Sequence, residues 1–192
     1  MDIITVQKRN SEEKAKKLRR AGLVPGIVFG GNLQDPVAIQ MEDRVARKLI
    51  QFKREGRKLQ LELEGKTIPV QIKESEQNAL KNEIIHISFQ ALSTDQKVNS
   101  IIHILLKNSD IVAGSLDRML LEIPYASLPA DMIDTVTVDL EGMLEGTVLT
   151  VADIPELQSD KIELQVDMSS IVLRINDKIR GGKQSSEEKI GE

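Results

Sequence analysis

The most chemically suggestive residues of this chain are five cations within a run of seven positions. They lie directly before a glycine-containing bend, and they are Lys14, Lys16, Lys17, Arg19 and Arg20. Like charges at this density repel one another unless an anion neutralises them, and the backbone amides of such a bend can also approach phosphates. The alternative is the solvated face of a short helix. We favour contact with a polyanion.

A second candidate is His86, one of two histidines in the chain. It alternates with Ser88 on the outward face of an expected strand, where an imidazole could donate to a phosphate, a ribose hydroxyl or a base edge. A histidine there can equally be structural or an ordinary surface residue. His103 lies on an apolar strand in the second half, and two distant histidines with scattered carboxylates make no metal-ligand spacing. We predict no metal site and no cofactor.

Sequence motifs of catalysis are absent. The chain has neither a G-x-x-x-x-G-K-[ST] phosphate loop nor a G-x-S-x-G nucleophile elbow. It has no cysteine, which excludes disulfides, thiolate nucleophiles and cysteine-ligated zinc. A hydrolase remains possible only as a carboxylate and histidine site assembled by folding. We predict a protein that is not an enzyme.

Charge divides the chain into two unlike halves. Residues 1–91 carry 17 Lys and Arg against 12 Asp and Glu, whereas residues 92–192 carry 9 against 18. Because attraction to phosphate is screened within about 10 Å at ordinary salt, the local excess matters more than the net charge. With no Trp, one Tyr and three Phe, base stacking is disfavoured, and recognition of a duplex or of shape remains.

A strand and a helix must position the basic run. Residues 3–9 alternate between apolar and polar side chains, which predicts a half-buried strand with Arg9 on its wet face. A short helix is expected from Asn10 or Ser11 through Arg20, with two glutamates, Glu12 and Glu13, in its first turn.

The remaining pattern is mainly β, so the fold class is mainly β with a few helices. In the first half we expect a helix over 42–54 and strands over 24–29, 37–40, 59–63, 68–72 and 83–90. In the last of these, Ile85, Ile87 and Phe89 should face inward, and Ile84, His86, Ser88 and Gln90 outward. In the second half we expect strands over 100–107, 116–125, 135–140, 147–152, 162–167 and 170–175.

The chain is expected to form two domains. A polar stretch at 93–99 coincides with the reversal of charge, which predicts domains at 1–92 and 93–180 and a disordered tail at 181–192. The N-terminus lacks a secretory leader, and no run approaches the roughly 20 apolar residues that span a bilayer. A soluble, intracellular protein with no membrane partner is expected.

Three segments carry a family resemblance. The string KAKKLRRAGLVPGIVFGG runs from Lys14 to Gly31, LKNEIIHISF from Leu80 to Phe89, and a third segment spans Ser127 to Ile154. Together they resemble the bacterial ribosomal protein L twenty-five and general stress protein Ctc family, in its longer two-domain form. The resemblance implies a small closed β-barrel with helices and a separate acidic β-rich domain. It also implies a cytoplasmic, ribosome-associated protein of translation that binds 5S rRNA in the large subunit.

The resemblance also implies a set of RNA-binding residues. We assign rRNA contacts to Arg9, Lys14, Lys16, Lys17, Arg19, Arg20, Phe29, Gln77, His86 and Ser88. The acidic second domain could contact neighbouring ribosomal proteins, or repel nonspecific RNA and so sharpen docking.

Several positions depart from the family pattern. Phe29 replaces a tyrosine, Ser88 replaces an aspartate, and Glu76 stands where the family has a glutamine. A one-residue bulge could substitute Gln77 for Glu76. Glu12 and Glu13 further replace the family's Gly-Lys. Lost donors and added negative charge leave open a divergent stress-related relative that binds another structured RNA or a protein.

Overall fold

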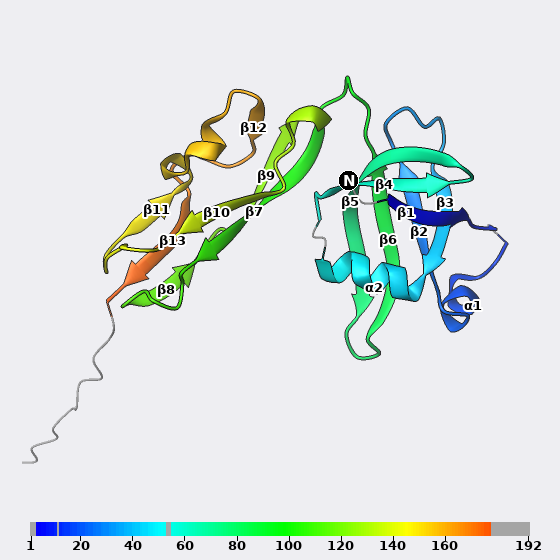
Figure 1. Cartoon of the computed structure of the whole chain (residues 1–192), viewed down its shortest axis with the longest axis horizontal. Coiled ribbons are helices and arrows are strands. Elements are labelled where there is room, and N and C mark those ends of the chain that lie inside the picture. Colours follow the sequence, from blue (N-terminus) through cyan, green and yellow to red (C-terminus); the bar gives the residue numbers. More distant parts are fainter. Residues whose placement is uncertain (1–2, 11, 53–54, 178–192) are drawn as a thin grey trace, which may run out of the picture.

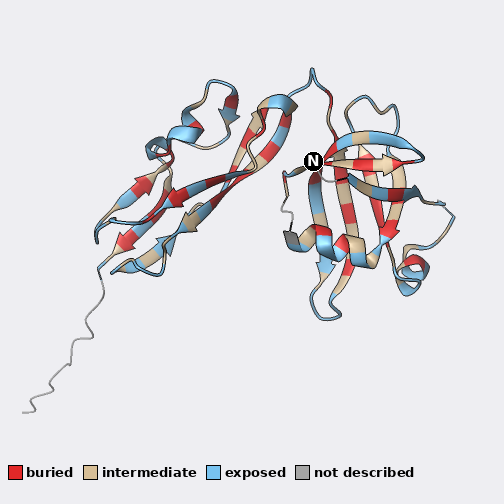
Figure 2. Ribbon diagram, viewed as in Figure 1, coloured by how far each residue is buried: buried red, intermediate tan, exposed pale blue. Residues whose placement is uncertain are grey.

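Two hydrophobic cores, each enclosed mainly by strands, organise the chain. The computed structural model describes residues 3–10, 12–52 and 55–177. One core is built from residues between Val6 and Ala91, and the other from residues between Ile102 and Ile175. Figure 2 shows the buried residues gathered in these two groups. Isoleucine, leucine and valine dominate both cores, as expected for a chain with few aromatic residues.

The first core fills a closed β-barrel with the strand order β1-β3-β2-β6-β5-β4. Its strands are β1 (Ile3–Lys8), β2 (Leu23–Phe29), β3 (Val37–Glu42), β4 (Lys58–Leu63), β5 (Lys66–Asn78) and β6 (Glu83–Ala91). Parallel pairing of β1 with β4 closes the barrel, which leaves no free sheet edge. The predicted mainly-β fold with an N-terminal closed barrel is confirmed.

Helix α2 (Asp43–Phe52) follows β3 without a loop and lies across the barrel (Figure 1). The helix was predicted over 42–54, and positions 53–54 lie outside the described residues. Ala46 and Leu49 are buried against the barrel core, one turn apart on the same face. This face fixes how the rest of the helix projects its charges.

Helix α1 (Ala15–Arg20) is shorter than the sequence pattern predicts. Lys14 at its N-cap is extended, and Glu12 and Glu13 precede the helix instead of forming its first turn. The backbone N–H of Glu12 donates to the side-chain oxygen of Asn10 at 3.1 Å, a local turn that competes with helical hydrogen bonding. The expected helix start at residue 10 or 11 is therefore wrong.

The second core lies between two sheets. Their strands are β7 (Val98–Lys107), β8 (Ser115–Arg118), β9 (Glu122–Ser127), β10 (Thr135–Asp139), β11 (Val148–Thr150), β12 (Ile162–Leu164) and β13 (Ile171–Asn176). The order is β10-β7-β9-β12 in one sheet and β11-β13-β8 in the other. Three short 3-10 helices occupy Pro129–Asp131, Val151–Asp153 and Pro155–Gln158.

Three predictions for the second half are wrong in detail. The strand expected over 162–167 ends at Leu164. The single strand expected over 116–125 is two strands in different sheets, because the chain crosses over between Arg118 and Glu122. The strand expected over 147–152 ends at Thr150. There Thr150 and Asp153 form a capping box that starts a 3-10 turn.

The outward face predicted for the last barrel strand also needs correction. Ile84, expected outside, is buried, whereas Ile85 is only half-buried. The pairing of β5 with β6 shifts register between Glu76 and Gln77, and such a bulge interrupts the alternation of faces. His86 and Ser88 remain partly exposed, as predicted.

The tail at 181–192, expected to be disordered, lies outside the described residues. Among the described residues, no helix has the length and apolar character needed to cross a membrane.

Candidate nucleic-acid interface

A polar strip crosses the outer face of the barrel from β1 to β5. Strand pairing places Gln7 opposite Gln40 and Glu76 opposite His86. Ser88 lies between Ile27 of β2 and Glu74 of β5. Since paired residues of adjacent strands point to the same face, these side chains form one continuous surface.

Arg9 enters this surface directly after β1. Its backbone N–H donates to the Ala38 carbonyl at 2.9 Å, and its Nη2 donates to the Glu13 carbonyl at 2.6 Å. Its Nε is buried and has no hydrogen-bond partner among the described residues. Leaving a buried donor unpaired costs about 1–3 kcal/mol, or more for a charged group. Arg9 is thus held in place with one donor still to be satisfied.

His86 lies in a mixed electrostatic environment. Burial lowers the pKa of His86 below its ordinary value of 6.5; Glu76 opposes this shift, Arg9 reinforces it, and Glu74 opposes it as well. Its Nδ1 lies 3.4 Å from the Ser88 hydroxyl. At neutral pH the ring is therefore mostly neutral, with both a donor and an acceptor nitrogen.

The five cations of the basic run are not equivalent. Arg19 donates from Nε to Glu83 at 2.9 Å, and only 19% of its side chain is exposed. Lys17 pairs with Glu13 at 3.0 Å, but its side chain is 77% exposed, so this pair contributes little and opens readily. The other three, Lys14, Lys16 and Arg20, are exposed. Arg19 chiefly fastens α1 to β6, and the others face solvent.

Phe29 and Gln77 lie towards the margins of the polar strip. Phe29 is half-buried opposite Gln90 at the end of β2. Gln77 is exposed, but the bulge pairs it with Ile84 and leaves Glu76 opposite His86. The bulge anticipated from the sequence is present, yet it does not bring Gln77 into the place of Glu76.

Sequence reasoning missed Gln7 and Gln40. Gln7 could have been found, because it shares the alternation of Arg9 two residues later. Gln40 could not, since its side chain meets Gln7 only through the pairing of β1 with β3. The side-chain oxygen of Gln40 is buried and has no partner within the described part of the chain.

The described residues contain no group of three or more His, Cys, Asp or Glu that could hold a metal ion. The strip combines guanidinium, amide, imidazole and hydroxyl groups with the carboxylates of Glu74 and Glu76 on the outside of a closed barrel. Arg9 carries a positive charge there, and the other polar groups donate or accept hydrogen bonds. The fold is that of a closed β-barrel with a polar strip on its outer face.

The chain belongs to the Ribosomal L25p family, whose sequence pattern matches residues 4–89. One relative, the large ribosomal subunit protein bL25 of Akkermansia muciniphila, is 32% identical over 143 residues, covering 72% of this chain and 71% of the relative. The bL25 protein of Caldanaerobacter subterraneus subsp. tengcongensis is 26% identical over 189 residues, covering 97% and 94%. That of Nitrosomonas europaea is 28% identical over 156 residues, covering 78% and 77%.

The family expected from the sequence is therefore confirmed, in its long form, because the similarity extends across both cores. Membership in a family of ribosomal proteins also confirms that the protein is not an enzyme. The hydrolase alternative is excluded by the same finding.

Proposed function

We propose that this protein is a component of the large ribosomal subunit that binds 5S rRNA through the outer face of its barrel. The relatives are large-subunit proteins by name, which supports the first part. The observation that carries the second part is the buried Nε of Arg9, which has no hydrogen-bond partner among the described residues, on a side chain whose charge also acts on His86. A phosphate oxygen would accept from that donor and pair with the positive charge of Arg9.

In this proposal the residues have distinct roles. The phosphate contacts come from Arg9, Lys14, Lys16, Lys17 and Arg20. Arg19 holds α1 against the barrel through Glu83. His86 and Ser88 supply polar contacts to ribose or base edges and fix the register, with Phe29 and Gln77 contributing at the margins. Phe29 is the only Phe, Tyr or Trp among the proposed rRNA-binding residues, so stacking on bases can contribute little. Recognition by shape, phosphates and ribose hydroxyls suits such a surface.

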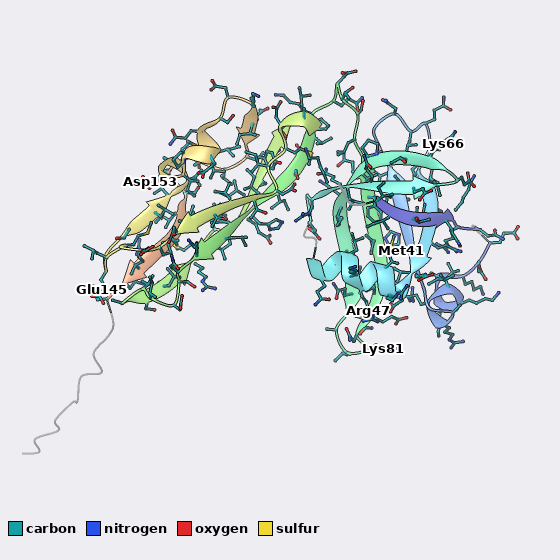
Figure 3. The ribbon with its side chains drawn as sticks, in the orientation of Figure 1. Met41, Arg47, Lys66, Lys81, Glu145 and Asp153 are labelled. Atoms are coloured by element: carbon teal, nitrogen blue, oxygen red, sulfur yellow. The ribbon has the colours of Figure 1, made fainter. Side chains whose placement is uncertain are left out.

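The test is binding of the full chain to 5S rRNA across a salt series, with tRNA as competitor. Arg9→Gln should weaken 5S rRNA binding by about tenfold, as for loss of a charge-assisted contact. It should also reduce the slope of log affinity against log salt by about 0.9. Lys66→Gln removes the same charge at the opposite end of the barrel from α1 (Figures 1 and 3) and should change neither quantity. Equal affinity for 5S rRNA and tRNA would contradict the proposal.

One observation favours a second candidate, a divergent stress-related relative that binds another structured RNA or a protein. Glu74 and Glu76 lie opposite Ser88 and His86 and place two carboxylates within the polar strip. Carboxylates repel phosphates, so they weaken the case for tight rRNA binding. Preference for a different RNA in the competition above would select this candidate.

We further propose that the chain divides at residues 92 and 93 into two domains, one around each core. The protein then acts in the cytoplasm on the ribosome. Its acidic second half contacts neighbouring ribosomal proteins or repels nonspecific RNA.

A further inference from the structure

A hollow of about 950 Å³ opens between helix α2 and strands β1 and β3. Its volume lies near the upper end of the range of about 300–1,000 Å³ typical of ligand pockets. The apolar part of its lining is formed chiefly by Ile4, Leu23, Met41, Val45 and Leu49. Met41, labelled in Figure 3, lies beside α2 at this place. Such a lining could enclose a flat, uncharged ring.

The polar part of the lining contains the amide pair Gln7 and Gln40. Gln40 donates from Nε2 to the side-chain oxygen of Gln7 at 3.4 Å. The side-chain oxygen of Gln40 is left buried with no donor from any described residue. The Gln40 residue as a whole is only half-buried, so its side chain can turn this acceptor into the hollow, where an N–H group of a ligand would pair it.

Two cations of α2 stand at the rim. Arg44 and Lys48 are four residues apart and so lie on the same side of the helix. Arg44 contacts Glu42 at 3.8 Å, but the two side chains are 90% and 67% exposed. An ion pair this exposed contributes little, so Arg44 can turn to a phosphate at small cost.

The hollow is continuous with the polar strip. Gln7 lies on β1 two residues before Arg9, and Gln40 pairs with Gln7 across the strands. An RNA seated on Arg9 would therefore lie within reach of Gln7 in the lining of the hollow, two residues or about 7 Å along the strand. Bases that leave the stack are commonly held by apolar walls and read by hydrogen bonds to their polar edge.

We infer that this hollow receives one unpaired nucleotide of the RNA that the barrel binds. The nucleotide carries an amino-bearing base, adenine or cytosine. Its exocyclic amine donates to the free oxygen of Gln40, its ring packs on the apolar walls, and its phosphate contacts Arg44 and Lys48. The inference rests on the proposed RNA-binding function and names a second, base-reading site within it.

The experiment compares binding of the full chain to 5′-phosphorylated oligo(A) and oligo(U) of equal length, with 5S rRNA measured in parallel. Oligo(A) should bind about tenfold more tightly than oligo(U), since only adenine carries the amine. Gln40→Leu should abolish this preference, whereas Gln96→Leu, at an exposed position outside the hollow, should preserve it. Thermal unfolding monitored by circular dichroism verifies that each variant is folded.

A second pair of changes keeps the test sharp if Gln40→Leu fails to fold. Arg44→Gln combined with Lys48→Gln alters only exposed side chains and should weaken both oligonucleotides alike. Unchanged binding by this double variant would overturn the inference. Binding of 5S rRNA without any preference for oligo(A) would overturn the base-reading site and leave the proposed function standing.

The remaining outcomes show whether the nucleotide in the hollow comes from 5S rRNA, from another RNA or from free nucleotides. If the chain fails to bind 5S rRNA but keeps its preference for oligo(A), the proposed 5S rRNA-binding function is contradicted. The base-reading site is then supported for a different RNA. Adenosine monophosphate binding as tightly as oligo(A) would show a site for free nucleotides and overturn an RNA source.

Discussion

His86 shows how neighbours set the chemistry of a single side chain. Burial holds its pKa below 6.5, with Arg9 reinforcing the shift and Glu76 and Glu74 opposing it. Nearby phosphate would favour the imidazolium and raise the pKa of His86 in the complex. The bound state then takes up a proton that the free protein lacks.

RNA affinity should therefore rise as pH falls through the pKa of His86 in the complex, and level off below its pKa in the free protein. A pKa rise of about one unit on binding corresponds to about a tenfold gain in affinity. Binding to 5S rRNA measured at a series of pH values from slightly alkaline to mildly acidic checks this. His86→Asn keeps a polar side chain that cannot titrate and should flatten the profile. An identical profile in this variant would assign the pH dependence to another group.

The Tyr125 hydroxyl holds the segment that connects β9 to β10. Tyr125 is fully buried; its hydroxyl donates to the Ile133 carbonyl at 2.9 Å and accepts from the Ile133 N–H at 2.8 Å. These two bonds tie the segment between β9 and β10 back onto β9. In a strand connection with only a short 3-10 turn, the side chain takes the place of backbone pairing.

Tyr125→Phe should lower the free energy of unfolding of the second half by about 1–3 kcal/mol, because it leaves both backbone groups of Ile133 unpaired. Urea unfolding followed by far-ultraviolet circular dichroism measures the change. Ser169→Ala removes an exposed hydroxyl and should leave the unfolding midpoint in place. If Tyr125→Phe does the same, the hydroxyl does not stabilise the fold.

The two halves of the molecule meet through polar contacts between side chains and backbone carbonyls. The Gly56 carbonyl accepts from the Ser100 hydroxyl at 3.3 Å, and the His103 Nε2 lies 2.9 Å from the Glu55 carbonyl. Lys58 on β4 donates to the Pro129 carbonyl at 2.6 Å. The barrel and the second half thus make polar contacts beyond the connecting segment between β6 and β7.

Gly56→Ala should weaken this junction. An added Cβ would lie 2.6 Å from the Ser100 hydroxyl and 2.9 Å from the Ile101 carbonyl, at a backbone φ of +83°. Gly142→Ala is the matched control, because Gly142 has a φ of +79° and nothing within 4 Å of an added Cβ. Both variants bear the left-handed strain, but only Gly56→Ala should lose a further 1–3 kcal/mol or so from overpacking. If thermal or urea unfolding shows the same loss of stability for Gly56→Ala and Gly142→Ala, the junction accommodates the added Cβ without overpacking.

Local sequence patterns were enough to predict several secondary-structure elements, the basic half and the family of this protein. The alternation of residues 3–9 and the helical spacing of Ala46 and Leu49 predicted their elements within a few residues. The placement of charge marked the basic half, and three segments identified the family. Each of these signals depends on residues close together in the chain, whose faces follow directly from the two-residue and 3.6-residue periods.

Only the tertiary structure decided which of the candidate side chains act together. Arg19 is engaged by Glu83, 64 residues away, and Gln40 meets Gln7 across 33 residues. Glu76 faces His86 because of the register between β5 and β6. Strand register and barrel closure arise from pairing between distant segments, and a one-residue shift moves a side chain to the other face. The basic run was visible in the sequence, but only the tertiary structure showed that Glu83 engages Arg19 while Lys14, Lys16 and Arg20 are exposed.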